Sequence, residues 1–322
     1  PRRRGGEYLG YTTDHAPRRR APSVGPYTSR QMTERLEESV QAKGVPLLDH
    51  TQVIRILSDG GSVYGLLCLN TLAAGEVDRF LIVRCKNVVY ATGGPAGMYA
   101  DSVYPVSHYG ATGLALEAGV SGKNLTEWQY GLASVKPRWN VSGTYMQVLP
   151  RVISTGEDGG DEREFLMDFF QTPAEMLSKL FLKGYQWPFD VRKVADGSSI
   201  IDILVYLERC KGRRVFLDYR QNPLGREIPY DALKPDAREY LHRAGACFGT
   251  PLERLNHMNA PAVEFYRDKG ADLSAQPLEI SLCAQHNNGG LAIDCWWQTN
   301  LSGFFAAGEA AASHGVYRPG GT

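Results

Sequence analysis

The chain has 322 residues, and its 35 lysines and arginines balance its 35 aspartates and glutamates, so the formal net charge is zero. A protein without net charge has no overall field to attract nucleic acid or an anionic membrane surface. The chain has no apolar run of transmembrane length and no signal-peptide pattern, while 43% hydrophobic and 22% charged residues are ordinary for a globular protein. We therefore expect a cytoplasmic protein with no nucleic-acid partner, and one or two domains.

Six cysteines are spread along the chain without a Cys-x-x-Cys pair, at positions 68, 85, 210, 247, 283 and 295. This spacing predicts free thiols in a reducing compartment, and neither a disulfide framework nor a metal site. At the C-terminus, Pro319-Gly320-Gly321-Thr322 breaks off at a helix-start signal, and the first residues begin no helix or strand, so we expect a fragment of a longer chain.

The N-terminal third begins with a polar, proline-rich stretch over residues 7–27, which contains three consecutive arginines. Such a run is usually a solvated charge run, and the alternative is a loop that contacts a ligand phosphate. A helix is predicted next, capped by Thr28 and ended by Lys43-Gly44, because apolar residues at 32, 36 and 40 fall on one face. Residues 45–48 are predicted to form a short strand.

Three further strands are predicted at residues 52–57, 63–69 and 80–85, separated by the turn signals Asp59-Gly60-Gly61 and Ala74-Gly75-Glu76. Together they predict an antiparallel meander. A buried strand follows and ends in Ala91-Thr92-Gly93-Gly94, where glycines let the backbone approach a ligand.

The most informative stretch lies near the C-terminus. It contains Gln285-His286-Asn287-Asn288-Gly289-Gly290, then an apolar strand over residues 303–307 that ends in Gly308-Glu309, then His314-Gly315-Val316-Tyr317-Arg318-Pro319-Gly320-Gly321. An acidic residue directly after a buried strand lies at the carboxyl end of that strand, where α/β sheets bind ligands.

The order helix, strand, meander and strand resembles the second half of the dinucleotide-binding domain of two-part FAD flavoproteins. Four later motifs narrow the resemblance to the fumarate reductase, succinate dehydrogenase and L-aspartate oxidase superfamily. They are Tyr109-Gly110-Ala111-Thr112-Gly113 with Glu117-Ala118-Gly119-Val120, then Glu127-Trp128-Gln129-Tyr130, then Gly308-Glu309, and the closing His314-Gly315-Val316-Tyr317-Arg318-Pro319-Gly320-Gly321. The resemblance covers about residues 14–135 and 278–322.

The resemblance implies an α/β fold: part of a two-part, Rossmann-like FAD-binding domain with a β-meander, and an inserted α+β capping domain. We assign residues 1–135 and 278–322 to the incomplete FAD-binding domain and 136–277 to the capping domain. Helix-like patterns at 174–182, 200–211 and 232–243 and a strand pattern at 212–218 fit a cap that closes over the flavin and excludes water.

FAD is the implied cofactor, and the implied contacts with it fall on nine residues. Glu309 matches a glutamate that binds a ribityl hydroxyl, and Val53 lies where the family presents backbone groups to adenine. The other candidates are Ala91, Thr92, Gly93, Gly94, Gly308, Gly320 and Gly321. The Gly-x-Gly-x-x-Gly loop that cradles the FAD pyrophosphate is absent from these 322 residues, so we expect this polypeptide to bind FAD weakly or not at all.

Three residues are candidates for the substrate side of the chemistry. Arg318 matches the family's carboxylate-binding arginine, and a guanidinium suits a bidentate carboxylate contact; the alternative is a structural ion pair. His314 either bonds substrate or holds its loop. His286, flanked by amides and glycines, is a candidate for substrate contact or acid–base catalysis. The alternative is a structural histidine whose ring is hydrogen-bonded to backbone groups.

The sequence also departs from the family. Tyr130-Gly131-Leu132-Ala133 stands where relatives have His-Pro-Thr-Gly, Asp190-Val191-Arg192 only echoes the segment with the proton-shuttling arginine, and the family's His-Tyr-x-x-Gly-Gly becomes Gln285-His286-Asn287-Asn288-Gly289-Gly290. These differences predict a divergent branch whose substrate is neither plain succinate nor plain fumarate.

The sequence thus predicts a flavin-dependent oxidoreductase that transfers a hydride between FAD and a small, carboxylate-bearing molecule, with a possible electron-transfer partner. The alternative is a truncated or non-catalytic flavoprotein-like module that holds no cofactor. A hydrolase using Ser313 and His314 is disfavoured, because Ser313 lacks a Gly-x-Ser-x-Gly elbow.

Overall fold

The computed structural model describes residues 26–312 except 74, 76, 77 and 107, together with the backbone of four short strands nearer the N-terminus. Those strands are β1 (Arg3–Arg4), β2 (Glu7–Tyr8), β3 (Gly10–Thr13) and β4 (Ala16–Pro22). They form two antiparallel pairs, β1 with β2 and β3 with β4.

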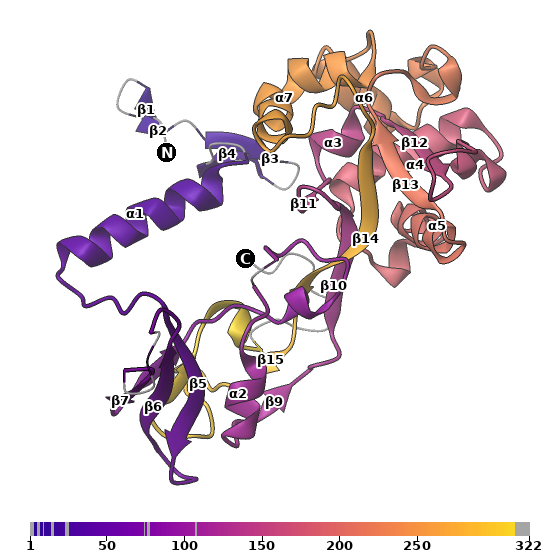
Figure 1. Ribbon diagram of the computed structural model, residues 1–322. Helices are drawn as coiled ribbons and strands as arrows, with labels where there is room; N and C mark the ends of the chain where they lie inside the picture. Colours follow the sequence, from indigo (N-terminus) through magenta and orange to yellow (C-terminus); the bar gives the residue numbers. More distant parts are fainter. Residues whose placement is uncertain are drawn as a thin grey trace. The chain divides into compact units, whose positions relative to one another are not determined.

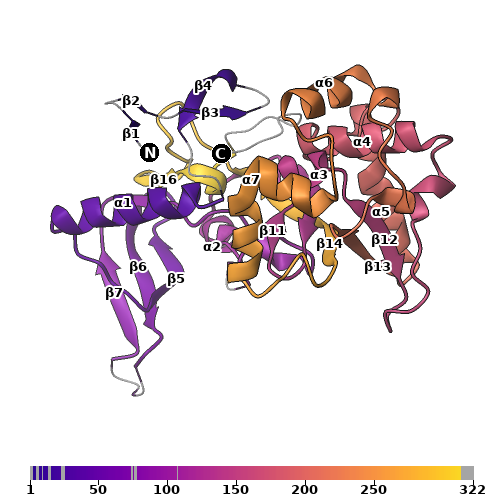
Figure 2. The same cartoon turned by 90° about the horizontal axis from the view of Figure 1, so that it is seen from above.

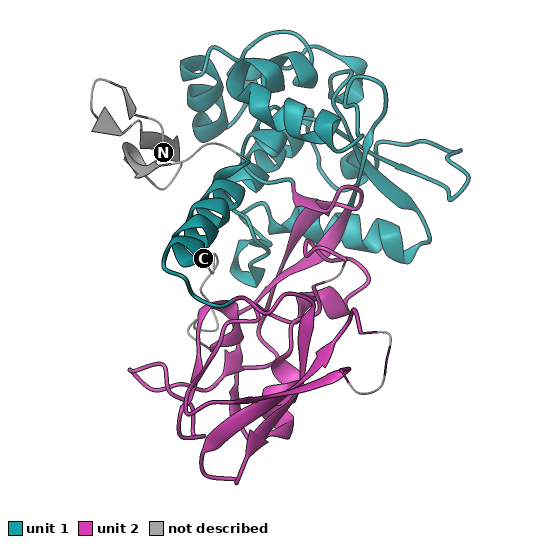
Figure 3. Cartoon of the chain, turned by 60° about the vertical axis from the view of Figure 1, so that its left-hand side comes forward, with its two compact units in different colours: residues 1–46, 141–280 teal, residues 47–140, 281–322 magenta. Residues whose placement is uncertain are grey.

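The chain divides into two compact units, one of residues 1–46 and 141–280 and the other of residues 47–140 and 281–322 (Figure 3). The inserted segment 141–280 has boundaries close to those expected for a capping domain. Residues 1–46 group with this segment and not with 47–140. The assignment of FAD binding to one part and capping to the other remains a prediction.

In the unit of residues 47–140 and 281–322, the predicted meander is present. Strands β5 (Thr51–Ser58), β6 (Val63–Asn70) and β7 (Phe80–Arg84) lie in that order and pair antiparallel (Figure 2). The turn between β5 and β6 is closed by Asp59, whose Oδ1 accepts the backbone N–H groups of Gly61 at 2.9 Å and Ser62 at 2.7 Å. An aspartate that bonds the backbone two residues on favours a tight turn.

Two strands far apart in the sequence lie side by side in the same unit. Strand β8 (Val88–Tyr90) pairs parallel with β16 (Phe304–Ala306), with Val88 opposite Phe304. Helix α2 (Thr112–Glu117) follows η1 (Ala96–Met98). The core beneath these elements consists of Ile56, Val63, Tyr90, Ala115, Val120, Leu291, Leu301, Phe304, Ala306, Ala310 and Ala311. This packing fixes the carboxyl ends of β8 and β16 beside each other.

A longer strand, β14 (Leu278–Asn287), contributes residues 278–280 to one unit and 281–287 to the other. It belongs to a five-stranded sheet in the order β11-β10-β14-β13-β12. The other members are β10 (Trp128–Ser134), β11 (Trp139–Asn140), β12 (Arg151–Thr155) and β13 (Arg214–Asp218). The two-residue strands β9 (Gly122–Lys123) and β15 (Gly290–Leu291) pair antiparallel.

The segment 141–280 is mainly helical, with its helices gathered around β12 and β13 (Figure 1). The helices are α3 (Thr144–Gln147), α4 (Pro173–Tyr185), α5 (Ser199–Cys210), α6 (Pro235–Arg243) and α7 (Pro251–Asp268). Four short 3₁₀ turns described in this segment are η2 (Phe165–Asp168), η3 (Val191–Lys193), η4 (Pro223–Gly225) and η5 (Tyr230–Ala232). A further 3₁₀ turn, η6 (Gly308–Ala310), follows β16 in the other unit. Helices α4 and α5 and strand β13 were predicted, and α7 was not.

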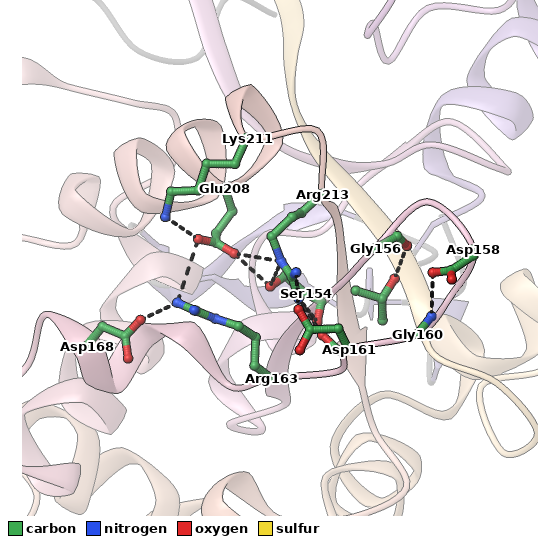
Figure 4. A network of polar contacts seen from close by, with 11 residues as sticks. Ser154, Gly156, Asp158, Gly160, Asp161, Arg163, Asp168, Glu208, Lys211 and Arg213 are labelled. Carbon is green, nitrogen blue, oxygen red and sulfur yellow. Dashed lines mark hydrogen bonds and ion pairs between the residues drawn. The ribbon is translucent and has the colours of Figure 1, made fainter.

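A buried polar network joins β12 to the helices of this segment (Figure 4). Glu208, only 2% exposed, accepts bonds from the Ser154 hydroxyl at 2.7 Å and from Lys211 Nζ at 2.6 Å. Arg213 donates to Ser154 Oγ at 3.0 Å and to Asp161 Oδ2 at 2.7 Å. The network therefore ties the loop after β12 to α5.

Two local predictions are wrong. Residues 45–48 form no strand, because Pro46 lacks the N–H that a strand ladder needs. Helix α1 (Thr28–Ala42) has Tyr27 at its N-cap, so Thr28 is its first residue and not its cap. The apolar face of α1 is exposed, with Met32 at 58% and Leu36 at 59%. None of the described helices combines the length and apolar character needed to cross a membrane.

Candidate functional site at the ends of β8, β14 and β16

The parallel pair β8–β16 brings two predicted segments together. Residues 91–94 follow β8, and Gly308-Glu309 follows β16. Because β8 and β16 run in the same direction in register, both segments leave the same edge of the pair. The proposed cofactor contacts Thr92, Gly93 and Gly94 therefore lie at the same edge as Glu309.

Glu309 is held against Gly94 and the end of β14. Its Oε1 accepts the backbone N–H of Asn287 at 2.8 Å. A Cβ added at Gly94 would lie 2.8 Å from Glu309 Cγ and closer still to the carboxylate. The glycine at position 94 is thus required by the Glu309 side chain itself, a reason that the sequence did not reveal.

Two further side chains at this edge were not identified from the sequence. His108 lies over Gly93, where an added Cβ would be 2.6 Å from His108 Nε2. The ring of Tyr104 packs edge-on against His108, with centroids 5.2 Å apart. Burial raises the pKa of the Tyr104 hydroxyl, and the Glu309 carboxylate nearby raises it further. Both residues come from the irregular segment after η1, which has no periodic pattern to mark it.

The end of β14 has one face whose polar groups bond one another. Gln129 Nε2 donates to Asn288 Oδ1 at 2.9 Å, and His286 Nδ1 lies 3.3 Å from the same oxygen. All three side chains are buried, His286 at 8% exposure. The predicted catalytic role of His286 is not tested by this arrangement, but its ring is engaged with an amide.

The other face of β14 carries buried polar groups without partners. The side-chain oxygen and nitrogen of Gln285 and the Oδ1 of Asn287 have no hydrogen-bond partner among the described residues, and neither has the Tyr104 hydroxyl. Gln285 is 6% exposed and Asn287 is 3% exposed. Buried polar atoms are nearly always paired in proteins, so unpaired ones indicate where a water, an ion or a ligand atom can bind.

The remaining predicted site residues are placed elsewhere or fall outside the described part of the chain. Val53 lies in β5, opposite Cys68, on the three-stranded sheet. Ala91 is exposed at the end of β8. Arg318, His314, Gly320 and Gly321 lie outside the described residues. Asp190 is the N-cap of η3, and its carboxylate pairs with Arg192 at 2.7 Å, which lowers the pKa of Asp190.

The described residues suit a cofactor that presents hydroxyl groups. Glu309 is half-buried at a strand end, and a carboxylate accepts hydrogen bonds from alcohols. Gly308 adopts a positive φ of 65°, which lets the chain turn directly after β16 and aim Glu309 at this edge. The orphaned polar atoms of Gln285, Asn287 and Tyr104 add further groups able to bond a ligand here.

Comparison with protein families agrees with this site. A family described as "FAD binding domain" matches residues 3–160. The predicted cofactor, FAD, is thereby confirmed, as is the resemblance to FAD-dependent oxidoreductases.

Curated relatives match nearly the whole chain. A fumarate reductase (CoM/CoB) polypeptide of Methanothermobacter marburgensis is 23% identical over 318 residues, which cover 94% of this chain and 47% of that protein. The L-aspartate oxidase of Mesorhizobium japonicum is 24% identical over 320 residues, covering 96% of this chain and 50% of that protein. The chain therefore spans about half the length of the curated relatives it matches.

Solved structures share the fold. A quinol–fumarate reductase of E. coli aligns with a TM-score of 0.54 and 22% identity, covering 91% of this chain and 45% of that chain. A quinol–fumarate reductase with menaquinol molecules also gives a TM-score of 0.54, with 20% identity, over 86% of this chain and 42% of that chain. The predicted mixed α/β flavoprotein fold is confirmed by these likenesses.

Proposed function

Since the chain is similar to FAD-dependent fumarate reductases and L-aspartate oxidases, we propose that it forms part of an oxidoreductase that transfers a hydride between FAD and a small, carboxylate-bearing molecule. The electrons would pass to or from a further electron-transfer partner. The sequence departures described above favour a substrate other than plain succinate or fumarate.

One observation carries this proposal: the register of β8 and β16 places Thr92, Gly94 and Glu309 at a single strand edge. Ligands of α/β sheets bind at the carboxyl ends of strands. Glu309 would accept a hydrogen bond from a ribityl hydroxyl of the cofactor, and the backbone after β8 would lie beside it. When bound, FAD supplies the hydride acceptor or donor.

The substrate side rests on residues near the C-terminus. Arg318 would hold a carboxylate through its two-pronged guanidinium. His314 would bond the substrate or orient the loop that carries Arg318. His286, held through its Nδ1 side by Asn288, would bond the substrate or move a proton through its other ring nitrogen.

We expect the 322-residue polypeptide by itself to bind FAD weakly and to be inactive, because its sequence contains no Gly-x-Gly-x-x-Gly loop. Titration of the polypeptide with FAD, followed by fluorescence of the flavin, measures this affinity. A stoichiometric flavin spectrum that survives gel filtration would contradict the expectation of weak binding.

The same titration tests the flavin site itself. Glu309→Gln removes the charged acceptor and should weaken FAD binding about tenfold. Glu117→Gln, on α2 of the same unit, is the matched control and should leave the affinity unchanged. Equal affinities for the wild type and Glu309→Gln would count against a flavin at this edge.

A further inference from the structure

We propose that Gln285, Asn287 and Tyr104 bind an uncharged, planar ligand group that carries a hydrogen-bond donor beside an acceptor, such as the edge of an imide or a carboxamide. The inference names the ligand chemistry at the site of the proposed function, and it rests on that function for the site's location. Its test needs no FAD.

The first observation is that buried polar atoms at this site lack hydrogen-bond partners among the described residues. A buried polar group left without a hydrogen bond is destabilising, because it loses its bonds with water and gains none. Among the described residues, both side-chain polar atoms of Gln285, which is 6% exposed, lack a partner. The same holds for the side-chain oxygen of Asn287, which is 3% exposed, while its Nδ2 donates to Leu125 O at 3.5 Å. Water, an ion or a ligand can complete the bonding of such groups.

The second observation is that Gln285 and Asn287 share one face of β14 and that Glu309 lies beside both Asn287 and Tyr104. Gln285 and Asn287 are two residues apart on β14, so both side chains leave the same face of the strand. Tyr104 belongs to a segment that runs along β14, where Val103 N donates to Ala284 O at 3.1 Å. Glu309 joins the two elements, because it bonds Asn287 N and lies beside the Tyr104 hydroxyl.

The opposite face of β14 shows that polar residues in this strand can be satisfied by the protein. There, Asn288 Oδ1 accepts from Gln129 and contacts His286. On the face of Gln285, Ser281 bonds Asp101 and Asn287 Nδ2 donates to Leu125 O at 3.5 Å, whereas neither polar atom of the Gln285 amide has a partner among the described residues. Among the described side chains of β14, the Gln285 amide is therefore the best candidate for a ligand contact, because both of its polar atoms lack partners there.

The charges around the cluster favour a neutral ligand group over a carboxylate. Glu309 lies beside it, and a second carboxylate, Asp101, accepts the Ser281 hydroxyl at 2.6 Å on the same strand face. The guanidinium of Arg138 approaches Tyr104, but it donates to the backbone oxygens of Tyr104 at 2.9 Å and Ala100 at 3.4 Å. A carboxamide side chain offers one acceptor and two donors, which complement an imide or amide edge.

Two sources could supply such an edge: a free small molecule, or the pyrimidine ring of a flavin, which is a cyclic imide. Binding of succinimide and of succinate to the 322-residue chain would be measured by ligand-observed NMR, and binding of riboflavin by fluorescence quenching. The variants are Gln285→Leu, which removes the amide at similar volume, and Gln129→Leu, which removes the amide that is bonded to Asn288.

We expect Gln285→Leu to weaken the binding of succinimide or riboflavin at least tenfold and to leave the binding of succinate unchanged. The melting temperature of Gln285→Leu should be unchanged or higher, because an unpaired amide has been removed, whereas that of Gln129→Leu should fall. A loss confined to riboflavin assigns the edge to a flavin, and a loss of succinimide binding assigns it to a free ligand.

Three results would overturn the inference: a loss of succinate binding in Gln285→Leu as large as that of the imides, unchanged binding of both imides by Gln285→Leu, or a fall in melting temperature as large as that of Gln129→Leu. Failure of FAD binding to respond to Glu309→Gln would instead count against the proposed function alone. Succinimide binding that depends on Gln285 would stand in that case, because the probe contains no flavin.

Discussion

The buried charges of Arg254 and Glu208, in the segment 141–280, are bonded by the protein, whereas several buried polar atoms at the end of β14 have no partner among the described residues. Arg254, at 0% exposure, donates to the carbonyls of Val148, Phe248 and Gly249 and to the side chain of Asn222. Glu208 is bonded by Ser154 and Lys211 as Figure 4 shows. At the end of β14, Gln285 has no such partner among the described residues.

Buried polar side chains should therefore contribute differently to stability in the two regions. A charge that is buried and fully bonded fixes the packing of the elements it joins, and its removal leaves several acceptors unpaired. An amide that is buried and unbonded adds nothing to the stability of the free protein. Substitutions should therefore reduce stability in the first region and ligand binding in the second.

The largest effect is expected for Arg254→Met. The substitution removes the donor of four buried hydrogen bonds that Arg254, on α7, makes to oxygen atoms of other segments. The free energy of unfolding should therefore fall by about 3–5 kcal/mol. Urea denaturation followed by far-UV circular dichroism measures the change. Arg243→Met, at an exposed arginine paired with Glu239 on α6, is the control and should leave the midpoint in place. Equal urea midpoints for Arg254→Met and Arg243→Met would show that the buried, bonded arginine contributes no more to stability than the exposed one.

An intermediate effect is expected for Gly94→Ala. The new methyl group would displace the Glu309 side chain and break its bond to Asn287 N, at a cost of about 1–3 kcal/mol. In a Glu309→Ala background the same change should cost little, because the obstructing side chain is gone. Denaturation of the two single variants and the double variant gives the coupling energy. Additive effects would show that Gly94 serves a purpose other than making room for Glu309.

The smallest effect is expected for Glu208→Gln and should appear in the pH dependence. Burial alone raises the pKa of Glu208, but bonds from Lys211 and Ser154 outweigh it and hold the pKa below its usual 4.5. A lowered folded-state pKa contributes stability that is complete above pH 4.5 and is lost as the pH falls through the folded value. Stability curves of the wild type should thus steepen below pH 4.5, and those of Glu208→Gln should be flatter there. Glu239→Gln, on the exposed surface, should follow the wild type.

The sequence predicted those elements whose pattern is local. The meander, α4, α5 and β13 each combine apolar periodicity with flanking turn or cap residues, and all are present. Helix α7 was missed because Pro261 lies inside it, where a proline normally ends a helix. A capping box of Thr250 and Glu253 marks its start and was the signal that could have revealed it.

The candidate site could be predicted only in part, because its geometry depends on contacts between distant segments. Glu309 and the glycines after β8 are marked by sequence motifs. Tyr104 and His108 are not, since they come from an irregular segment. The motif around His286 shows two alternating faces, and the sequence does not say which side chains are bonded internally; the structure shows bonds for His286 and Asn288 and leaves the Gln285 amide without a partner among the described residues.

The pairing of β8 with β16 also has a consequence for how the protein is made. Val88 must find Phe304, so all of residues 89–303 have to leave the ribosome before this contact can form. Non-local pairings of this kind close slowly and leave apolar strand edges uncovered in the meantime. The nascent polypeptide is therefore most prone to aggregate in the interval between synthesis of the first strand and arrival of the second, and chaperone dependence during expression is the expected sign.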